Sequence, residues 1–229
     1  MSDTPQVVAD ERLKRESFGA RLMKRPELGA IAGLVVVTVF FMVTADSSMF
    51  TLSGIMNFMT PAAQLDILAI GAAMLMIGGE FDLSIGSMVA FAGLIFAACT
   101  VTLGLPLILA IPITFMVAAA IGSVNGTIVL KTGLPSFIVT LAFLFILRGA
   151  SLVGLKIATG GSTQLRGVRD SVESDWLMPI FSGDAFTGLF AWMAETGIID
   201  TFNNGTPKVP GIPVEILWFV GLALVATYV

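Results

Sequence analysis

The sequence predicts an all-α fold, a polytopic bundle of about six transmembrane helices with its N-terminus in the cytoplasm. Hydrophobic residues make up 56% of the 229 residues and charged residues only 12%, whereas a soluble domain is about half apolar and about one quarter charged. Mean hydropathy is +0.94. The apolar runs are continuous and approach the ~20 residues that a helix needs to cross the hydrocarbon. This pattern favours helices over the alternating strands of a membrane β-barrel.

The residue types that are missing exclude several functions. There is no histidine, so zinc sites and acid–base catalysis built on histidine are excluded. The single cysteine, Cys99, lies in an apolar run and is expected to be a small buried hydrophobe. We therefore predict no catalytic residue and no metal site. The net charge of −4 gives no sign of a nucleic-acid partner, and we expect none.

Residues 1–28 form a polar tail that we place in the cytoplasm. The tail holds half of the 12 basic residues of the chain, and positive charge beside a first span is retained on the cytoplasmic side. Its acidic residues and the lack of a cleavage pattern argue against a signal peptide. An amphipathic surface helix and a solvated tail both stay open for it. The basic residues are Arg12, Lys14, Arg15, Arg21, Lys24 and Arg25.

Residues 29–229 are expected to form one transmembrane domain. Pro61 is expected to open the second span, because proline is favoured at the first position of a helix. Gly104-Leu105-Pro106 and Lys131-Thr132-Gly133 indicate short turns. Counting spans from a cytoplasmic N-terminus puts residues 156–212 on the outer side of the membrane. The expected spans are about 29–45, 61–79, 85–103, 107–130, 135–155 and 213–229.

The outer loop over residues 156–212 is expected to contain an amphipathic helix. Four apolar residues recur there at i, i+3, i+4 and i+7, which is one face of a helix. We expect this face to lie on the helix bundle or on the membrane surface. The four residues are Phe186, Leu189, Phe190 and Met193.

Two ionisable residues interrupt the apolar spans. The helical face of Asp66 is expected to point into the bundle, because a charge in hydrocarbon must be paired or hydrated. That face also carries Ile70, Ala73 and Ile77. Arg148 lies near the outer end of its span, where it either reaches the headgroups or pairs with an acid inside the bundle.

Asn125 lies inside a small-residue motif of the fourth expected span. Gly122 and Gly126 are four residues apart on either side of it. This spacing suits close helix packing with an interhelical hydrogen bond from the asparagine. Such spacings are common in membrane helices, so the motif alone predicts packing and nothing more.

The most polar stretch between two spans is Gly78–Ser87, which holds two carboxylates, two hydroxyls and three glycines. Gly78 and Gly79 permit the left-handed geometry that closes a helix. Asp82 or Ser84 is expected to cap the next helix. From the residues alone two interpretations stay open, a capped turn without function and a helix break at the edge of a translocation path.

The same stretch, GGEFDLSIGS, resembles the signature GGIDLSVGS of the ribose/xylose/galactose-type permeases of bacterial ABC importers. Glu80-Phe81 stands where that pattern has a single isoleucine. A second region is similar to the NG…PPFIVTLG…RG segment of the same family, and the resemblance covers about residues 50–229. Its blocks are Asn125-Gly126, Pro135–Leu141, Arg148-Gly149, Thr159-Gly160-Gly161 and Ile212-Pro213-Val214.

The resemblance implies the membrane channel of an importer for a monosaccharide or similar polyol in the bacterial inner membrane. It also implies an ABC ATPase subunit on the cytoplasmic side and a periplasmic sugar-binding protein. A second permease copy, identical or related, and membrane lipid would surround the path. The chain has no phosphate-binding Gly-x-x-x-x-Gly-Lys-Ser/Thr motif, so ATP and magnesium are expected on the ATPase subunit. We expect no cofactor and no enzyme activity in this chain.

The resemblance and the polar stretch together suggest site residues. The helix break is expected to be built by Gly78, Gly79, Asp82 and Gly86. The residues expected to line the substrate pathway or its gate are Ser84, Ser87, Asn125 and Thr140.

Other functions stay open at this point. In an ion-coupled secondary transporter, Asp66, Glu80 and Asp82 would be proton or sodium sites. An ABC permease for a nucleoside or a branched-chain amino acid is a further alternative. Members of the resembled family are longer and carry their ATPase-coupling loop after the sixth span. We therefore expect this chain to be a fragment, or to be completed by another polypeptide.

Overall fold

The computed structural model describes residues 26–164 and 166–228. The chain divides into two compact units, Met1–Thr51 and Leu52–Val229. Residues 1–25, which make up most of the expected cytoplasmic tail, lie outside the described residues, so both interpretations of that tail stay predictions.

In its described residues, 26–51, the first unit holds one apolar helix and a short capped turn. Helix α2 covers Pro26–Thr44, where a span over residues 29–45 is expected. A 3-10 helix, η1 (Ser47–Phe50), follows. The Ser48 N–H donates to Oδ1 of Asp46 at 2.9 Å. Hydrogen bonding from Ser48 holds the pKa of the Asp46 carboxyl below its ordinary value.

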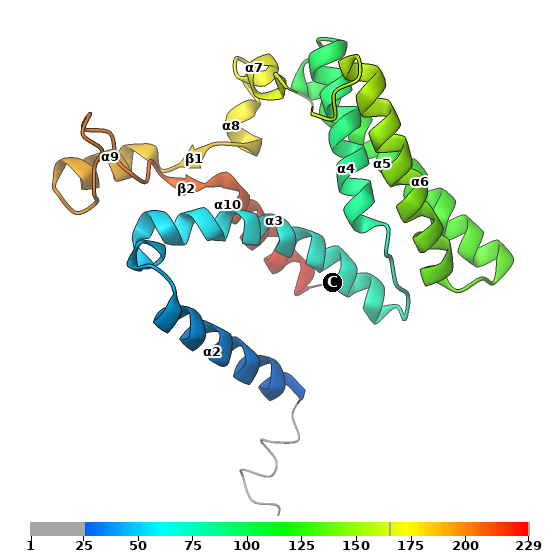
Figure 1. Cartoon of the computed structure of the whole chain (residues 1–229), viewed down its shortest axis with the longest axis horizontal. Helices are drawn as coiled ribbons and strands as arrows, with labels where there is room; N and C mark the ends of the chain where they lie inside the picture. The colour runs from blue at the N-terminus through cyan, green and yellow to red at the C-terminus, as the bar shows by residue number, and fades with distance from the viewer. Residues whose placement is uncertain (1–25, 165, 229) are drawn as a thin grey trace, which may run out of the picture. The chain divides into compact units, whose positions relative to one another are not determined.

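The second unit is mostly helical, as predicted, and Figure 1 shows its elements. A π-helical turn, η2 (Ala98–Thr102), continues α4. With η2 included, the four helices from α3 to α6 are long and apolar enough to cross a membrane by length and composition, and α2 and α10 are shorter apolar helices. The bounds are Leu52–Ile77 for α3, Ile85–Ala97 for α4, Leu107–Thr132 for α5, Ser136–Thr159 for α6 and Val214–Ala226 for α10.

The start of α3 corrects the sequence prediction. The helix begins at Leu52, and Pro61 lies inside it, so the expectation that Pro61 opens the helix is wrong. Proline inside a helix removes one backbone hydrogen bond, but a membrane helix tolerates it where neighbouring groups satisfy the backbone. The Thr60 hydroxyl contributes to this, because it donates to the Met56 carbonyl at 3.0 Å.

The helices of the second unit pack in two groups. Helix α3 packs against α10, whereas α4 packs against α5 and α6. Helices α4 and α6 run in the same direction, since the segment before α4 is bonded to the start of α6 and Leu94 meets Gly154 further along. A Cβ on Gly154 would lie 2.7 Å from Cδ2 of Leu94. Only glycine therefore allows this close approach without movement of the leucine.

The segment between α6 and α10 holds short elements. They are α7 (Val168–Val172), α8 (Met178–Phe181), α9 (Thr187–Glu195) and the strands β1 (Asp184–Ala185) and β2 (Ile212–Pro213). The two strands pair antiparallel, which is a small correction to the all-α prediction. Gly211 makes the pairing possible, because a Cβ there would collide with the Ala185 carbonyl oxygen.

Helix α9 matches the expected amphipathic helix only in part. Phe190 is buried, but Leu189 and Phe186 are exposed. Phe186 precedes the helix with a φ of 61°, so it leaves the predicted face. The buried face rests on the bundle through Met56 of α3. The small core here contains Phe190, Ile199 and Val209, with Met56, Met193 and Ile212 packed against it. Elsewhere, Cys99 is buried with a free thiol, in agreement with its expected role.

Candidate functional site

The break between α3 and α4 begins with a Schellman motif. The Gly79 N–H donates to the Met76 carbonyl at 3.0 Å, and the Glu80 N–H donates to the Leu75 carbonyl at 3.2 Å. These are the two hydrogen bonds that define this motif. Gly79 has a φ of 81°, which glycine adopts without strain. Gly79 therefore ends α3.

Replacing Gly79 by alanine is expected to lower the free energy of unfolding by about 1–2 kcal/mol, because a side chain disfavours the left-handed conformation. The matched control is Gly86→Ala. Gly86 lies inside α4, where a Cβ would meet no atom within 4 Å, so alanine there should be neutral or stabilise by up to about 1 kcal/mol. Thermal unfolding of the purified full-length protein in detergent measures both changes. Equal midpoints for the two variants would contradict the assigned role of Gly79.

Asp82 organises the next step of the break. Its Oδ1 accepts hydrogen bonds from the Ser84 N–H at 2.7 Å and the Ser84 hydroxyl at 2.6 Å. Ser84 is 0% exposed and immediately precedes α4, but its side chain makes no capping bond to the helix. Of the two expected caps, the Ser84 side chain is therefore not one, and the Asp82 carboxylate holds the turn instead.

Two hydroxyls at the start of α6 bind the break from the side. The Phe81 N–H donates to Oγ of Ser136 at 3.0 Å, and the Leu83 N–H donates to Oγ1 of Thr140 at 3.1 Å. The Thr140 hydroxyl donates in turn to the Ser136 carbonyl at 2.9 Å. Ser136 was not among the expected site residues. Its spacing of four from Thr140, which puts both hydroxyls on one helix face, is the signal that could have found it.

The other expected pathway residues are less engaged. Asn125 is 6% exposed, and its buried Oδ1 has no hydrogen-bond partner among the described residues. Ser87 is half-buried on α4. Gly86 is exposed, and nothing in the described part of the chain requires a glycine there. The pathway roles of Asn125 and Ser87 stay predictions.

The two intramembrane charges lie on open surfaces. Asp66 and Arg148 are exposed, and among the described residues the ion pair seen is that of Lys208 with Asp200. Both alternatives for Arg148 stay predictions. The face of α3 that is covered by other elements does not include Asp66. Ile77, which belongs to the predicted face, is 87% exposed. The residues of the covered face are Met56, Thr60, Ala63, Ile67 and Ile70.

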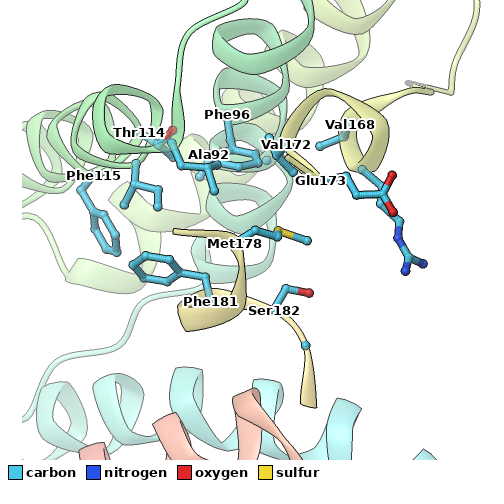
Figure 2. Close-up of a pocket in the computed structure, with 15 residues that line it drawn as sticks. Ala92, Phe96, Thr114, Phe115, Val168, Val172, Glu173, Met178, Phe181 and Ser182 are labelled. Atoms are coloured by element: carbon cyan, nitrogen blue, oxygen red, sulfur yellow. The ribbon is translucent and has the colours of Figure 1, made fainter. Parts of the chain in front are cut away.

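A cavity of about 920 Å³ lies where α4 and α5 meet α7 and α8 (Figure 2). Its walls are mainly apolar, with Phe96, Phe115 and Phe181 among them. Arg169 and Glu173 supply its charged groups. Such a wall offers a polar solute few hydrogen-bond partners. None of the expected pathway residues lines this cavity.

Metal ions are held in proteins by characteristic sets of ligand side chains. Within residues 26–164 and 166–228, no group of three or more His, Cys, Asp and Glu side chains is placed to hold a metal ion. The polar groups that the fold gathers at the break are hydroxyls, a carboxylate and backbone groups at helix ends, which suit hydrogen bonding.

Comparison with known proteins agrees with this architecture. A family model described as the permease component of branched-chain amino acid transport systems matches residues 54–229. The xylose transport system permease protein of Escherichia coli (strain K12) is 38% identical over 133 residues, which are 58% of this chain and 33% of that protein. The ribose import permease protein of Haemophilus influenzae is 33% identical over 135 residues, 58% of this chain and 41% of that protein.

A third relative aligns along almost the whole chain. The ribose import permease protein of Escherichia coli (strain K12) is 27% identical over 225 residues, 98% of this chain and 58% of that protein. No solved structure matches the chain. The chain therefore spans between a third and somewhat more than half of the length of these curated relatives.

Several helices long and apolar enough to cross the bilayer define a multi-pass membrane protein. The chain belongs to the protein family described as the permease component of branched-chain amino acid transport systems.

Proposed function

We propose that this chain is a membrane-spanning permease subunit of an ATP-driven importer, which moves a monosaccharide or similar polyol across the bacterial inner membrane by alternating access. The observation that carries the proposal is the similarity to relatives named as xylose and ribose permeases. The signature over Gly78–Ser87 supports the same class of solute. A protein named as an inner membrane ABC transporter permease, 38% identical over 97 residues, supports the location.

Hydrogen bonds at the helix ends put the break and the α7–α8 segment at opposite ends of the helices, and the expected cytoplasmic N-terminus sets the proposed orientation. The break lies at the end where α6 begins, since Phe81 bonds to Ser136. At the other end the Leu107 N–H, at the start of α5, donates to Asp175 of the α7–α8 segment at 2.8 Å. With a cytoplasmic N-terminus and about six spans, the break faces the cytoplasm and the α7–α9 segment faces the periplasm.

The break has a mechanical role in this proposal. Alternating access moves one group of helices against another around the solute path. Helix α3 packs with α10, α4 packs with α5 and α6, and the break joins the two groups. We assign Asp82, Ser84 and Thr140 to hold the break on α4 and α6, and Gly79 to the bend beside it. Ser87 and Asn125 are assigned to the path or its gate, since Oδ1 of Asn125 has no partner among the described residues.

The partners follow from the proposed class. An ABC ATPase subunit would bind from the cytoplasm and carry ATP and magnesium, so this chain needs no cofactor and catalyses no reaction by itself. A periplasmic sugar-binding protein would deliver the solute, and a second permease copy, identical or related, would complete the path within the lipid.

The test is uptake by proteoliposomes that contain the full-length permease, its ATPase and its binding protein. We expect ATP-dependent accumulation of labelled D-xylose or D-ribose, and no accumulation driven by a sodium or proton gradient alone. Excess unlabelled leucine or uridine should not compete. Uptake driven by an ion gradient without ATP would refute the proposed class, and competition by leucine or uridine would refute the proposed solute.

A further inference from the structure

A second cavity, of about 360 Å³, lies between the start of α3 and the residues that lead into α10. Ligand pockets range from about 300 to 1,000 Å³, so this one suits a small solute. On one side it is lined by Ser53, Asn57 and Thr60 of α3. On the other side Asp184, Phe202 and Lys208 contribute.

The α3 wall carries an unusual stripe of polar groups. Ser53, Asn57 and Thr60 recur at i, i+4 and i+7 and therefore share one face of the helix. Pro61 has no N–H, so the helical hydrogen bond to the Asn57 carbonyl cannot form. A backbone group freed inside a membrane helix is tolerated where other groups or a polar cavity satisfy it. Asn57 thus lines the cavity, and its backbone carbonyl lacks the helical donor that Pro61 cannot supply.

The opposite wall combines charge with an apolar ring. Asp184 makes no ion pair among the described residues, whereas Lys208 is paired with Asp200 at 3.4 Å. Lys208 thus has an acidic partner of its own, and the carboxylate, amide and hydroxyl oxygens of the other lining residues make the cavity rich in acceptors. Acceptors of this kind match the hydroxyl donors of a neutral solute, and Phe202 offers a face for its C–H groups.

Packing within the fold holds the walls of this cavity in place. Met56 and Val209, which also line the cavity, belong to the small core around Phe190. Asp184 pairs with Pro213 across the β1–β2 ladder. The cavity is therefore a built feature of the fold, and its polar groups are positioned before any solute arrives.

We propose that this cavity is an outer receiving site, which binds a neutral polyhydroxylated solute on the periplasmic side before it enters the path. The assignment rests on the proposed function for its orientation and its class of solute. The volume, the acceptor-rich walls and the Asp184 carboxylate, which has no ion pair among the described residues, favour a neutral polyol over an anion. The cavity also lies at the end of the bundle opposite the break.

The test is direct binding of D-xylose and D-ribose to the purified full-length permease in detergent. Saturation-transfer NMR measures the binding. We expect Asp184→Asn and Asn57→Leu each to weaken binding at least tenfold. Asp170→Asn is the matched control, because Asp170 is an exposed aspartate of the same segment that does not line the cavity, and it should bind as the wild type does. The thermal unfolding midpoint shows whether each variant is folded. Asp184→Asn changes an exposed side chain, so the test remains valid even if the Asn57→Leu protein does not fold.

Each result decides the proposal. No binding by the wild type, or equal binding by wild type and Asp184→Asn, would overturn the receiving site. Stronger binding of leucine than of either sugar would overturn its class of solute. These outcomes are separate from failure of the proposed function, which would appear as a lack of ATP-driven uptake by the wild-type complex even where the purified permease binds sugar.

Discussion

Replacing Asp82 by alanine is expected to lower the free energy of unfolding by about 3 kcal/mol and to remove most solute uptake. Oδ1 of Asp82 accepts two hydrogen bonds from Ser84, and Ser84 is 0% exposed. Hydrogen bonds to charged groups contribute about 1.5–3 kcal/mol each, and a buried donor left without an acceptor costs about 1–3 kcal/mol. The variant removes the acceptor of both Ser84 donors, so the turn before α4 loses its support.

Two control variants sharpen this expectation. Asp82→Asn keeps an oxygen at the Oδ1 position and should retain about half of the lost stability, because a neutral acceptor forms weaker hydrogen bonds. Glu80→Gln changes an exposed neighbour in the same break and should leave stability and uptake unchanged. Stability is measured by thermal unfolding with a thiol-reactive dye, since Cys99 is buried until the chain unfolds.

The outcome for Asp82→Ala separates two roles of the break. Loss of both stability and uptake supports a turn that transport requires. Loss of stability with normal uptake per folded molecule would mean that the break is a capped turn and nothing more. Wild-type stability would contradict the hydrogen bonds of Asp82 themselves.

Local signals in the sequence were sufficient to place most helices. A continuous apolar run has no way to satisfy its backbone in hydrocarbon except as a helix, so α5 and α6 begin and end within a few residues of the expected positions. The pair Gly78-Gly79 marks the end of α3, because only glycine enters the left-handed region freely. These features depend on neighbours in sequence, which is why they are predictable.

Features that depend on distant residues were not predictable in this way. The partners of the break, Ser136 and Thr140, lie more than 50 residues along the chain from Phe81 and Leu83. The polar cavity at α3 needs residues from the segment before α10, which no local pattern connects with Asn57. The preference of proline for the first position of a helix gave a wrong prediction at Pro61. The helix already begins at Leu52, and its surroundings tolerate the backbone hydrogen bond that proline cannot form.

The second large effect is expected for Thr140→Val, which should lower the free energy of unfolding by about 1–3 kcal/mol. Valine has nearly the same volume as threonine but cannot accept the Leu83 N–H, which now bonds to Oγ1 at 3.1 Å. Thr140 is 5% exposed, so water cannot take its place. Thr127→Val is the matched control. Among the described residues its exposed hydroxyl bonds only to the Ser123 carbonyl of its own helix, so its loss should cost little.

Thr140 and Ser136 hold the same short loop, and their effects should therefore be coupled. Ser136→Ala removes the acceptor of the Phe81 N–H, and once either bond is lost the loop is freer to relax. The double variant should then be destabilised by at least about 0.5 kcal/mol less than the sum of the single changes. Strict additivity, or a Thr140→Val protein as stable as Thr127→Val, would show that the two hydroxyls do not act as one support. If transport needs the break to move with α4 and α6, uptake per folded molecule should also fall in Thr140→Val and not in Thr127→Val, because only the first releases the break from α6.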